Sequence, residues 1–151
     1  MTVKNIGIKL FSLLFFFSVL TPAPIHAEGA AKARVTILVA SNNGNDFNLD
    51  NDAYRDELIK LFSFTAYHQV QSQLVDLTQG GASDVALPEG YQLQLTYQGN
   101  EGGSTLVKAL IQKGGSQFID TVLSVKNEGT VFLGGPQVTE GNLVIVLEMN
   151  F

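Results

Sequence analysis

The chain has 151 residues, with 14 acidic and 9 basic side chains and a formal net charge of −5. Such an acidic balance, with scattered bases, does not favour nucleic acid or an anionic membrane surface as a partner. Because the chain has no cysteine, disulfides and an acylated lipoprotein anchor are excluded, and the core alone must stabilise the fold.

The start of the chain has the three parts of a secretory signal peptide over residues 1–27. Lys4 and Lys9 supply the basic start, an apolar run covers residues 10–20, and the small residue Ala27 precedes the expected cleavage site. The apolar run is shorter than the roughly 20 residues that a membrane-spanning helix needs. We therefore expect an exported protein, periplasmic or secreted, without a membrane span after cleavage.

Residues 28–33, EGAAKA, are expected to be a flexible leader, and residues 34–151 a single domain. The stretch 34–41, RVTILVAS, is rich in β-branched residues and apolar on both faces. This pattern predicts a strand in the middle of a sheet.

An amphipathic helix is predicted near residues 52–63. Its apolar stripe at helical spacing consists of Tyr54, Leu58, Leu61 and Phe62. Residues 50–52 offer acidic and amide N-caps, and Asp56 is placed to pair with Lys60 one turn later.

The remainder of the chain has the pattern of short antiparallel strands separated by glycine-rich turns. Residues 91–98, YQLQLTYQ, alternate strictly between apolar and polar, which predicts a strand with one buried face. The last strand, LVIVLEMNF, is apolar on both faces, and Phe151 is expected to close the core. The fold class expected is α+β: one domain, mainly an antiparallel sheet or sandwich of about 7–8 strands, with one helix.

A tight turn at Gly114-Gly115 would set Lys113 opposite Ser116. The strands that continue from this turn would then pair Ile111 with Phe118, Leu110 with Ile119, Val107 with Val122 and Leu106 with Leu123. In this register Asp120 lies on an otherwise apolar face. We expect it to reach a loop or water, with a functional buried acid as the alternative.

Residues 46–57, DFNLDNDAYRDE, have the rhythm of a calcium-binding loop. An EF-hand loop places oxygen ligands at its first, third, fifth, seventh and twelfth positions. Those positions hold Asp46, Asn48, Asp50, Asp52 and Glu57. Asn51 occupies the sixth position, where an EF-hand loop usually has glycine, and the preceding element is a predicted strand rather than a helix. The competing interpretation is a solvated loop that caps the helix.

The composition offers few side chains of the types that catalyse reactions. His68 is the single histidine beyond the leader, so one chain cannot build a zinc site rich in nitrogen and sulfur ligands. We expect His68 to lie at an edge or on the surface. The glycine pairs do not stand between a strand and a helix start, which excludes a phosphate-binding loop.

Residues 118–151, FIDTVLSVKNEGTVFLGGPQVTEGNLVIVLEMNF, resemble the end of the secretin domain of outer-membrane secretion channels. The match is carried by Gly129, Thr130, Val131, Leu133, Gly134 and Gly135. As a whole, the chain resembles small exported bacterial proteins of unassigned function, through its strand ending in an Asn/Gly-rich loop, its aromatic segment 64–67 and its GGP strand pair. The resemblance implies the fold and export, and brings no catalytic residues.

These features lead us to expect a non-enzymatic exported binding or scaffolding domain, accessory to an envelope secretion or assembly system. Its partner would be another envelope protein, which could add a strand to an exposed sheet edge. The alternative is a weak calcium-binding exported domain that uses the 46–57 loop. No other cofactor is expected.

Overall fold

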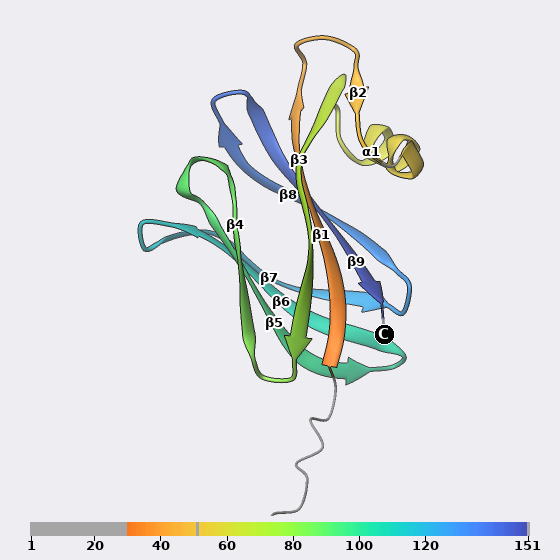
Figure 1. Ribbon diagram of the computed structural model, residues 1–151, viewed down its shortest axis with the longest axis vertical. Coiled ribbons are helices and arrows are strands. Elements are labelled where there is room, and N and C mark those ends of the chain that lie inside the picture. The colour runs from red at the N-terminus through yellow and green to blue at the C-terminus, as the bar shows by residue number, and fades with distance from the viewer. Residues whose placement is uncertain (1–29, 51, 151) are drawn as a thin grey trace, which may run out of the picture.

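The computed structural model describes residues 30–50 and 52–150, and nine strands in this part of the chain form two packed sheets (Figure 1). The strands are β1 (Ala30–Ser41), β2 (Phe47–Asn48), β3 (Ala66–Thr78), β4 (Ala82–Ala86), β5 (Gln92–Glu101), β6 (Ser104–Lys113), β7 (Ser116–Lys126), β8 (Thr130–Val138) and β9 (Gly141–Asn150). The 3-10 turns η1 (Asp52–Tyr54) and η2 (Pro88–Gly90) and the helix α1 (Arg55–Leu61) complete the described elements.

One sheet has the strand order β2-β3-β1-β9-β8, and the other has the order β4-β5-β6-β7. All neighbours are antiparallel except β2 and β3, which run parallel. The predicted class, a single α+β domain dominated by an antiparallel sandwich, is confirmed. The strand count exceeds the predicted 7–8 because the two-residue strand β2 was not predicted.

β1 lies in the centre of the five-stranded sheet, between β3 and β9, as its sequence predicts. It begins at Ala30, so the prediction of a flexible leader is wrong for residues 30–33. Ala31 and Ala33 are buried between the sheets, while Lys32 and Arg34 point outward. This alternation has the period of a strand with one buried face. Residues 28–29 lie outside the described part of the chain.

An apolar core fills the space between the two sheets. Tyr91, Leu93, Leu95 and Tyr97 all point into it, which confirms the predicted half-buried strand at β5. On β9 every residue from Leu143 to Leu147 is buried, so both faces are covered as predicted. Phe151 is not among the described residues.

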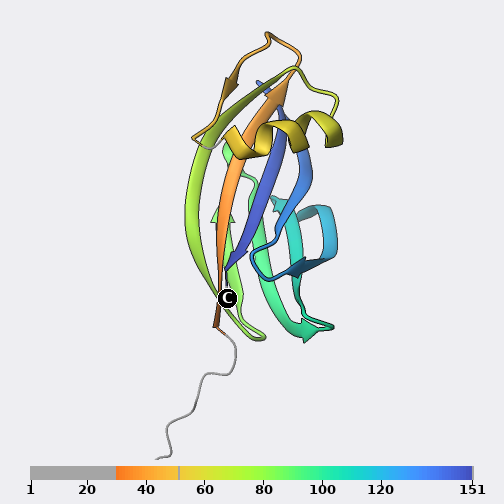
Figure 2. The ribbon, with the colours of Figure 1, turned by 90° about the vertical axis from the view of Figure 1, so that its right-hand side faces the viewer.

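The helix α1 lies across the upper half of β1 and β9 on the outer face of the five-stranded sheet (Figure 2). Tyr54 and Leu58 are buried there in a second apolar cluster with Leu38, Ala40, Tyr67, Val144 and Val146. Among the described residues, no helix is long and apolar enough to cross a membrane.

The end of the helix differs from the prediction. Phe62 has an extended backbone, so α1 ends at Leu61 and cannot carry its stripe further. Leu61, predicted to be buried, is 56% exposed. Lys60 forms its ion pair with Glu57, at 3.0 Å, rather than with Asp56.

Tyr67 of β3 links the helix to the sheet. Its ring stacks on Phe47 with 5.2 Å between ring centroids. Its buried hydroxyl donates hydrogen bonds to the carbonyl oxygens of Leu58, at 3.1 Å, and Phe62, at 3.4 Å. Burial raises the pKa of this hydroxyl above its ordinary value of 10.0.

The β6–β7 hairpin starts as predicted, with Lys113 opposite Ser116, but the register then shifts by one residue. A bulge near Phe118 sets Ile119 opposite Ile111 and Leu123 opposite Val107, so the predicted pairs beyond the turn are wrong. Asp120 therefore lies on the outer face. Its side chain is 44% exposed, and Lys108 Nζ approaches its Oδ1 at 3.2 Å. The prediction that Asp120 lies on an otherwise apolar face with Val107, Ala109 and Ile111 is therefore wrong.

Glu89 fastens the two sheets together at one end of the sandwich. It is in η2, just before β5, and it has a positive φ of 59°, which is uncommon outside glycine. Its Oε1 accepts a hydrogen bond at 2.6 Å from the N–H of Thr139, in the β8–β9 turn. This backbone hydrogen bond lowers the pKa of the Glu89 carboxyl below its ordinary value of 4.5.

We expect Glu89→Gln to reduce the loss of stability at acid pH. A group with a lowered folded-state pKa stabilises the fold above its unfolded pKa, and this contribution disappears as pH falls through the folded pKa. Urea unfolding of the wild type should therefore show an acid-dependent decrease below about pH 4.5 that is smaller in Glu89→Gln. Glu101→Gln, at an exposed carboxylate with no hydrogen bond among the described residues, is the control. Equal pH profiles for all three proteins would contradict the role of Glu89.

Candidate functional site

The described residues of the 46–57 run, 46–50 and 52–57, do not wrap around a common centre. Its alternating apolar residues determine its path: Phe47 stacks on Tyr67, and the Arg55 guanidinium lies 4.3 Å from the centre of the Phe47 ring. These contacts hold β2 as an extended segment beside β3. The sequence contains a signal for this extended conformation, because Phe47 and Leu49 alternate with the proposed ligands at the period of a strand.

The proposed calcium ligands have different neighbours. Asp46 Oδ2 lies 3.2 Å from His68 Nε2, and an Asp50 carboxylate oxygen accepts a hydrogen bond from Gln69. Glu57 pairs with Lys60, Asn48 lies in β2 and Asp52 begins η1. Across residues 30–50 and 52–150, no three His, Cys, Asp or Glu side chains come close enough to hold a metal ion. The structure therefore does not bring these five residues together.

His68 is half-buried and lines a hollow of about 430 Å³ at one end of the sandwich. Ser41 lines the same hollow, but its Oγ accepts a hydrogen bond from the N–H of Asn43 at 3.3 Å. In the described part of the chain, no hydrogen bond joins Ser41 to His68. The hollow thus shows no nucleophile hydrogen-bonded to a base.

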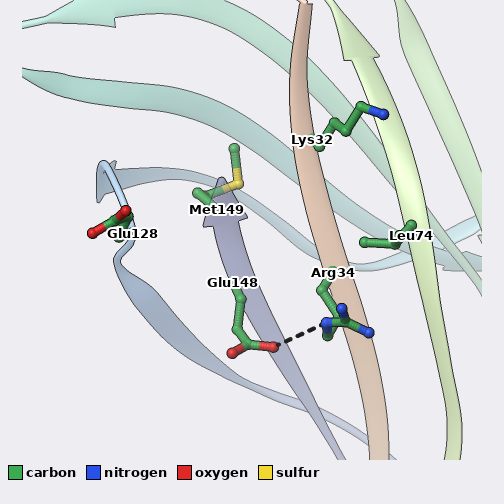
Figure 3. Close-up of a pocket in the computed structure, with 6 residues that line it drawn as sticks. All are labelled: Lys32, Arg34, Leu74, Glu128, Glu148 and Met149. Carbon is green, nitrogen blue, oxygen red and sulfur yellow. Dashed lines mark ion pairs between the residues drawn. The ribbon is translucent and has the colours of Figure 1, made fainter. Parts of the chain in front are cut away.

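The more extensive concave surface is the lower half of the outer face of the five-stranded sheet, below α1. We call it the outer groove. Its lower part, about 370 Å³, is shown in Figure 3 and is lined by Lys32, Arg34, Leu74, Glu128, Glu148 and Met149. Its upper part, about 410 Å³, shares two of these residues and is lined by Arg34, Thr36, Asp50, Tyr54, Gln69, Ser72 and Glu148.

Strand alternation places these side chains on one face. Arg34 of β1 stands opposite Glu148 of β9 and Leu74 of β3, so the three form a row across the sheet. Arg34 Nε lies 3.6 Å from Glu148 Oε2, and Lys32 Nζ lies 3.7 Å from Asp76 Oδ1. The groove therefore presents paired opposite charges rather than a field of one sign.

Leu74 is the exception among these polar side chains. It is 65% exposed, the largest exposed fraction among the large apolar residues of the described chain. It lies beside the two ion pairs, at the side of the groove formed by β3. A single exposed leucine is common on protein surfaces, but this one adjoins both the polar groove and the open edge of β3.

The backbone of β3 is open beside Leu74. Farther along the strand, the carbonyl of Asp76 points away from β1 and accepts a hydrogen bond from Ser83 Oγ at 2.8 Å. In an antiparallel pair, alternate residues direct both N–H and C=O toward the partner strand, and the residues between them direct both away. Ser72 and Leu74 share the alternation of Asp76, so their N–H and C=O groups face the open side.

This open edge is short. β2 covers the beginning of β3, at Tyr67 and His68, and Ser83 of β4 covers Asp76. Between them, no described strand pairs with the outer side of residues 70–75. Together, the edge and the outer groove form a site that can accept an extended segment and contact its side chains.

Protein-family models, curated proteins and solved structures give no match to this chain.

The sequence did not reveal this site because each of its residues belongs to an ordinary strand pattern. Arg34 begins the run that was correctly predicted as a central strand, and Leu74 belongs to an alternating strand. Arg34 and Leu74 are separated by 39 residues in the sequence, and they lie side by side only because β1 pairs with β3. The one available signal was the alternation of Lys32 and Arg34 with alanines, which indicates a charged outer face at the base of β1.

Proposed function

We propose that this chain is an exported binding domain that takes an extended segment of another envelope protein as an added strand on the edge of β3. The observation that carries this proposal is the exposed Leu74 beside unpaired backbone groups and the outer groove. An added strand would hydrogen-bond to Ser72 and Leu74, and every second side chain of the added strand would face the groove side.

The energetics indicate how such a partner would be recognised. Each hydrogen bond made by the two open residues contributes a net of about 0.5–1.5 kcal/mol, whereas association costs about 4–15 kcal/mol. Backbone pairing over so short an edge is therefore insufficient. Apolar contact with Leu74 and charge contact with the Lys32–Asp76 and Arg34–Glu148 pairs would supply the remainder and the specificity.

Leu74→Lys is expected to abolish partner capture from envelope extracts of the producing organism. The added charge lies opposite Arg34 and replaces the apolar contact, while the exposed position makes unfolding of the domain unexpected. The matched control is Ile59→Lys, the same change at a helix residue that is 52% exposed and away from the groove. Quantitative mass spectrometry should show partners enriched by the wild type and Ile59→Lys, and lost with Leu74→Lys. Equal enrichment by both variants would refute the proposed site.

Hydrogen exchange on the captured complex tests the strand addition itself. Binding should slow exchange at the Ser72 and Leu74 amides, because these groups face the open edge. Binding elsewhere on the domain would leave both amides exchanging at the rate of the free protein.

Export is part of the proposal and is supported by the basic start, apolar run and small residue over 1–27. We expect the mature protein to begin at Glu28. Intact-mass measurement on periplasmic or secreted material checks this directly, and a mass that retains residues 1–27 would contradict it.

A further inference from the structure

The second open edge of the molecule is β7. It ends the four-stranded sheet and runs for 11 residues without a proline. The other edges are less suited to pairing: β4 has 5 residues, and β8 contains Pro136 within a register shift. β7 has its own register shift near Phe118, but residues 119–126 beyond it form a regular edge without a proline.

The hairpin geometry shows which groups of β7 are available. Lys113 and Ser116 close the tight turn and form a hydrogen-bonded pair, so alternate residues of β6 face β7. Beyond the bulge, Ile119, which pairs with Ile111, and every second residue after it bond to β6. The residues that direct both N–H and C=O toward the open side are Asp120, Val122 and Ser124. Lys126 shares this alternation, but its C=O accepts a hydrogen bond from the Gly129 N–H at 2.9 Å.

The side chains of these residues lie exposed on the outer face of the sheet, and Val122 is 51% exposed. The order along the strand is acid, apolar, small polar, base. In an antiparallel arrangement, this order is complementary to itself: when Asp120 stands opposite Lys126 of a second copy, Val122 stands opposite Ser124. Outward-facing residues then oppose each other throughout. Each Val122–Ser124 pair can exchange two hydrogen bonds, and each Lys126 N–H can donate one to the C=O of Asp120.

We propose that β7 pairs antiparallel with β7 of a second copy, about a twofold axis that passes near Leu123. The two four-stranded sheets would then form one continuous sheet, and the Asp120–Lys126 attraction would occur twice across this self-complementary interface. Registers that set Asp120 opposite Asp120, or Lys126 opposite Lys126, place like charges face to face and are disfavoured. The β3 edge and the outer groove remain open in this dimer.

Sedimentation velocity of the purified protein over a range of concentrations tests the proposal. The wild type should show a reversible monomer–dimer equilibrium. Asp120→Lys and Lys126→Asp should each weaken self-association by roughly tenfold or more, because each puts like charges opposite one another twice. An equimolar mixture of the two variants should recover association, because each heterodimer contains both attractive pairs.

Several controls separate the interface from other effects. Asp84→Lys makes the same charge change on β4, at the opposite edge of the sheet, and should leave the dimer intact. Lys108→Gln removes the internal partner of Asp120 and should also leave it intact. Ser124→Pro removes an outward N–H that β6 does not use, and should weaken association without a charge change. Leu74→Lys, which alters the proposed partner site, should dimerise like the wild type. A wrong dimer proposal can therefore be distinguished from a wrong proposal for the partner site.

A wild type that stays monomeric at every concentration would overturn the proposal. So would charge variants that unfold like the wild type but whose mixture associates no better than either alone.

Discussion

Removing residues 147–151 is expected to abolish cooperative unfolding of this domain. The deletion removes Leu147 and Met149, which are 1% and 2% exposed, and their pairing with Val35 and Ala33 of β1. Truncating one large buried side chain to alanine costs about 2–5 kcal/mol. Because whole-domain stability is about 5–15 kcal/mol, losing both side chains and the end of a central strand leaves little of it.

Urea unfolding followed by circular dichroism would measure this effect. Two point variants calibrate it. Leu147→Ala keeps the strand and should unfold cooperatively with a loss of about 2–5 kcal/mol. Glu148→Gln removes only a half-exposed ion pair and should cost about 1 kcal/mol or less. A truncated chain that unfolds cooperatively near the wild-type midpoint would show that the end of β9 is dispensable.

Tyr67→Ala is expected to cost about 3–5 kcal/mol, the range for emptying a large aromatic site. The side chain is fully buried between α1 and the sheet, and its loss leaves Phe47 and Phe64 without their ring contacts. Tyr67→Phe isolates the hydroxyl. It should cost about 0.5–1.5 kcal/mol, because the ring contacts survive and only the hydrogen bonds to Leu58 and Phe62 are lost.

The same pair of proteins tests the raised pKa of Tyr67. Its neutral form is favoured in the folded state, so its contribution is complete below the unfolded pKa of about 10.0 and declines as pH rises through the folded value. Above about pH 10, the wild type should therefore lose stability more steeply than Tyr67→Phe in urea unfolding. Parallel alkaline profiles would place the hydroxyl in water rather than in the buried cluster.

A loss of less than 1 kcal/mol in Tyr67→Ala would contradict the role of the ring.

The regular parts of the fold could be predicted because burial imposes a period on the sequence. Leu93 and Leu95 alternate with polar residues, so the inner face of β5 was identifiable without any knowledge of its neighbours. β1 and β9 are apolar on both faces because the sheet lies between a second sheet and a helix. These features depend on local sequence and were predicted correctly.

The errors arose where a single residue changes the register or ends an element. The turn at Gly114-Gly115 sets only the first pair of the hairpin, and the bulge at Phe118 reverses what a regular ladder would predict for every residue beyond it. Likewise, the end of α1 at Leu61 depends on the aromatic contacts that draw the following chain back to the sheet. The outer groove was beyond prediction because it requires the three-dimensional order of β3, β1 and β9.

The strand order of the five-stranded sheet also constrains when the domain can fold. β1, the first described strand, has β9, the last, as one of its neighbours, and β9 separates it from β8. The sheet therefore cannot be completed until β9 has been synthesised, and the high contact order of the β1–β9 pairing favours slow folding.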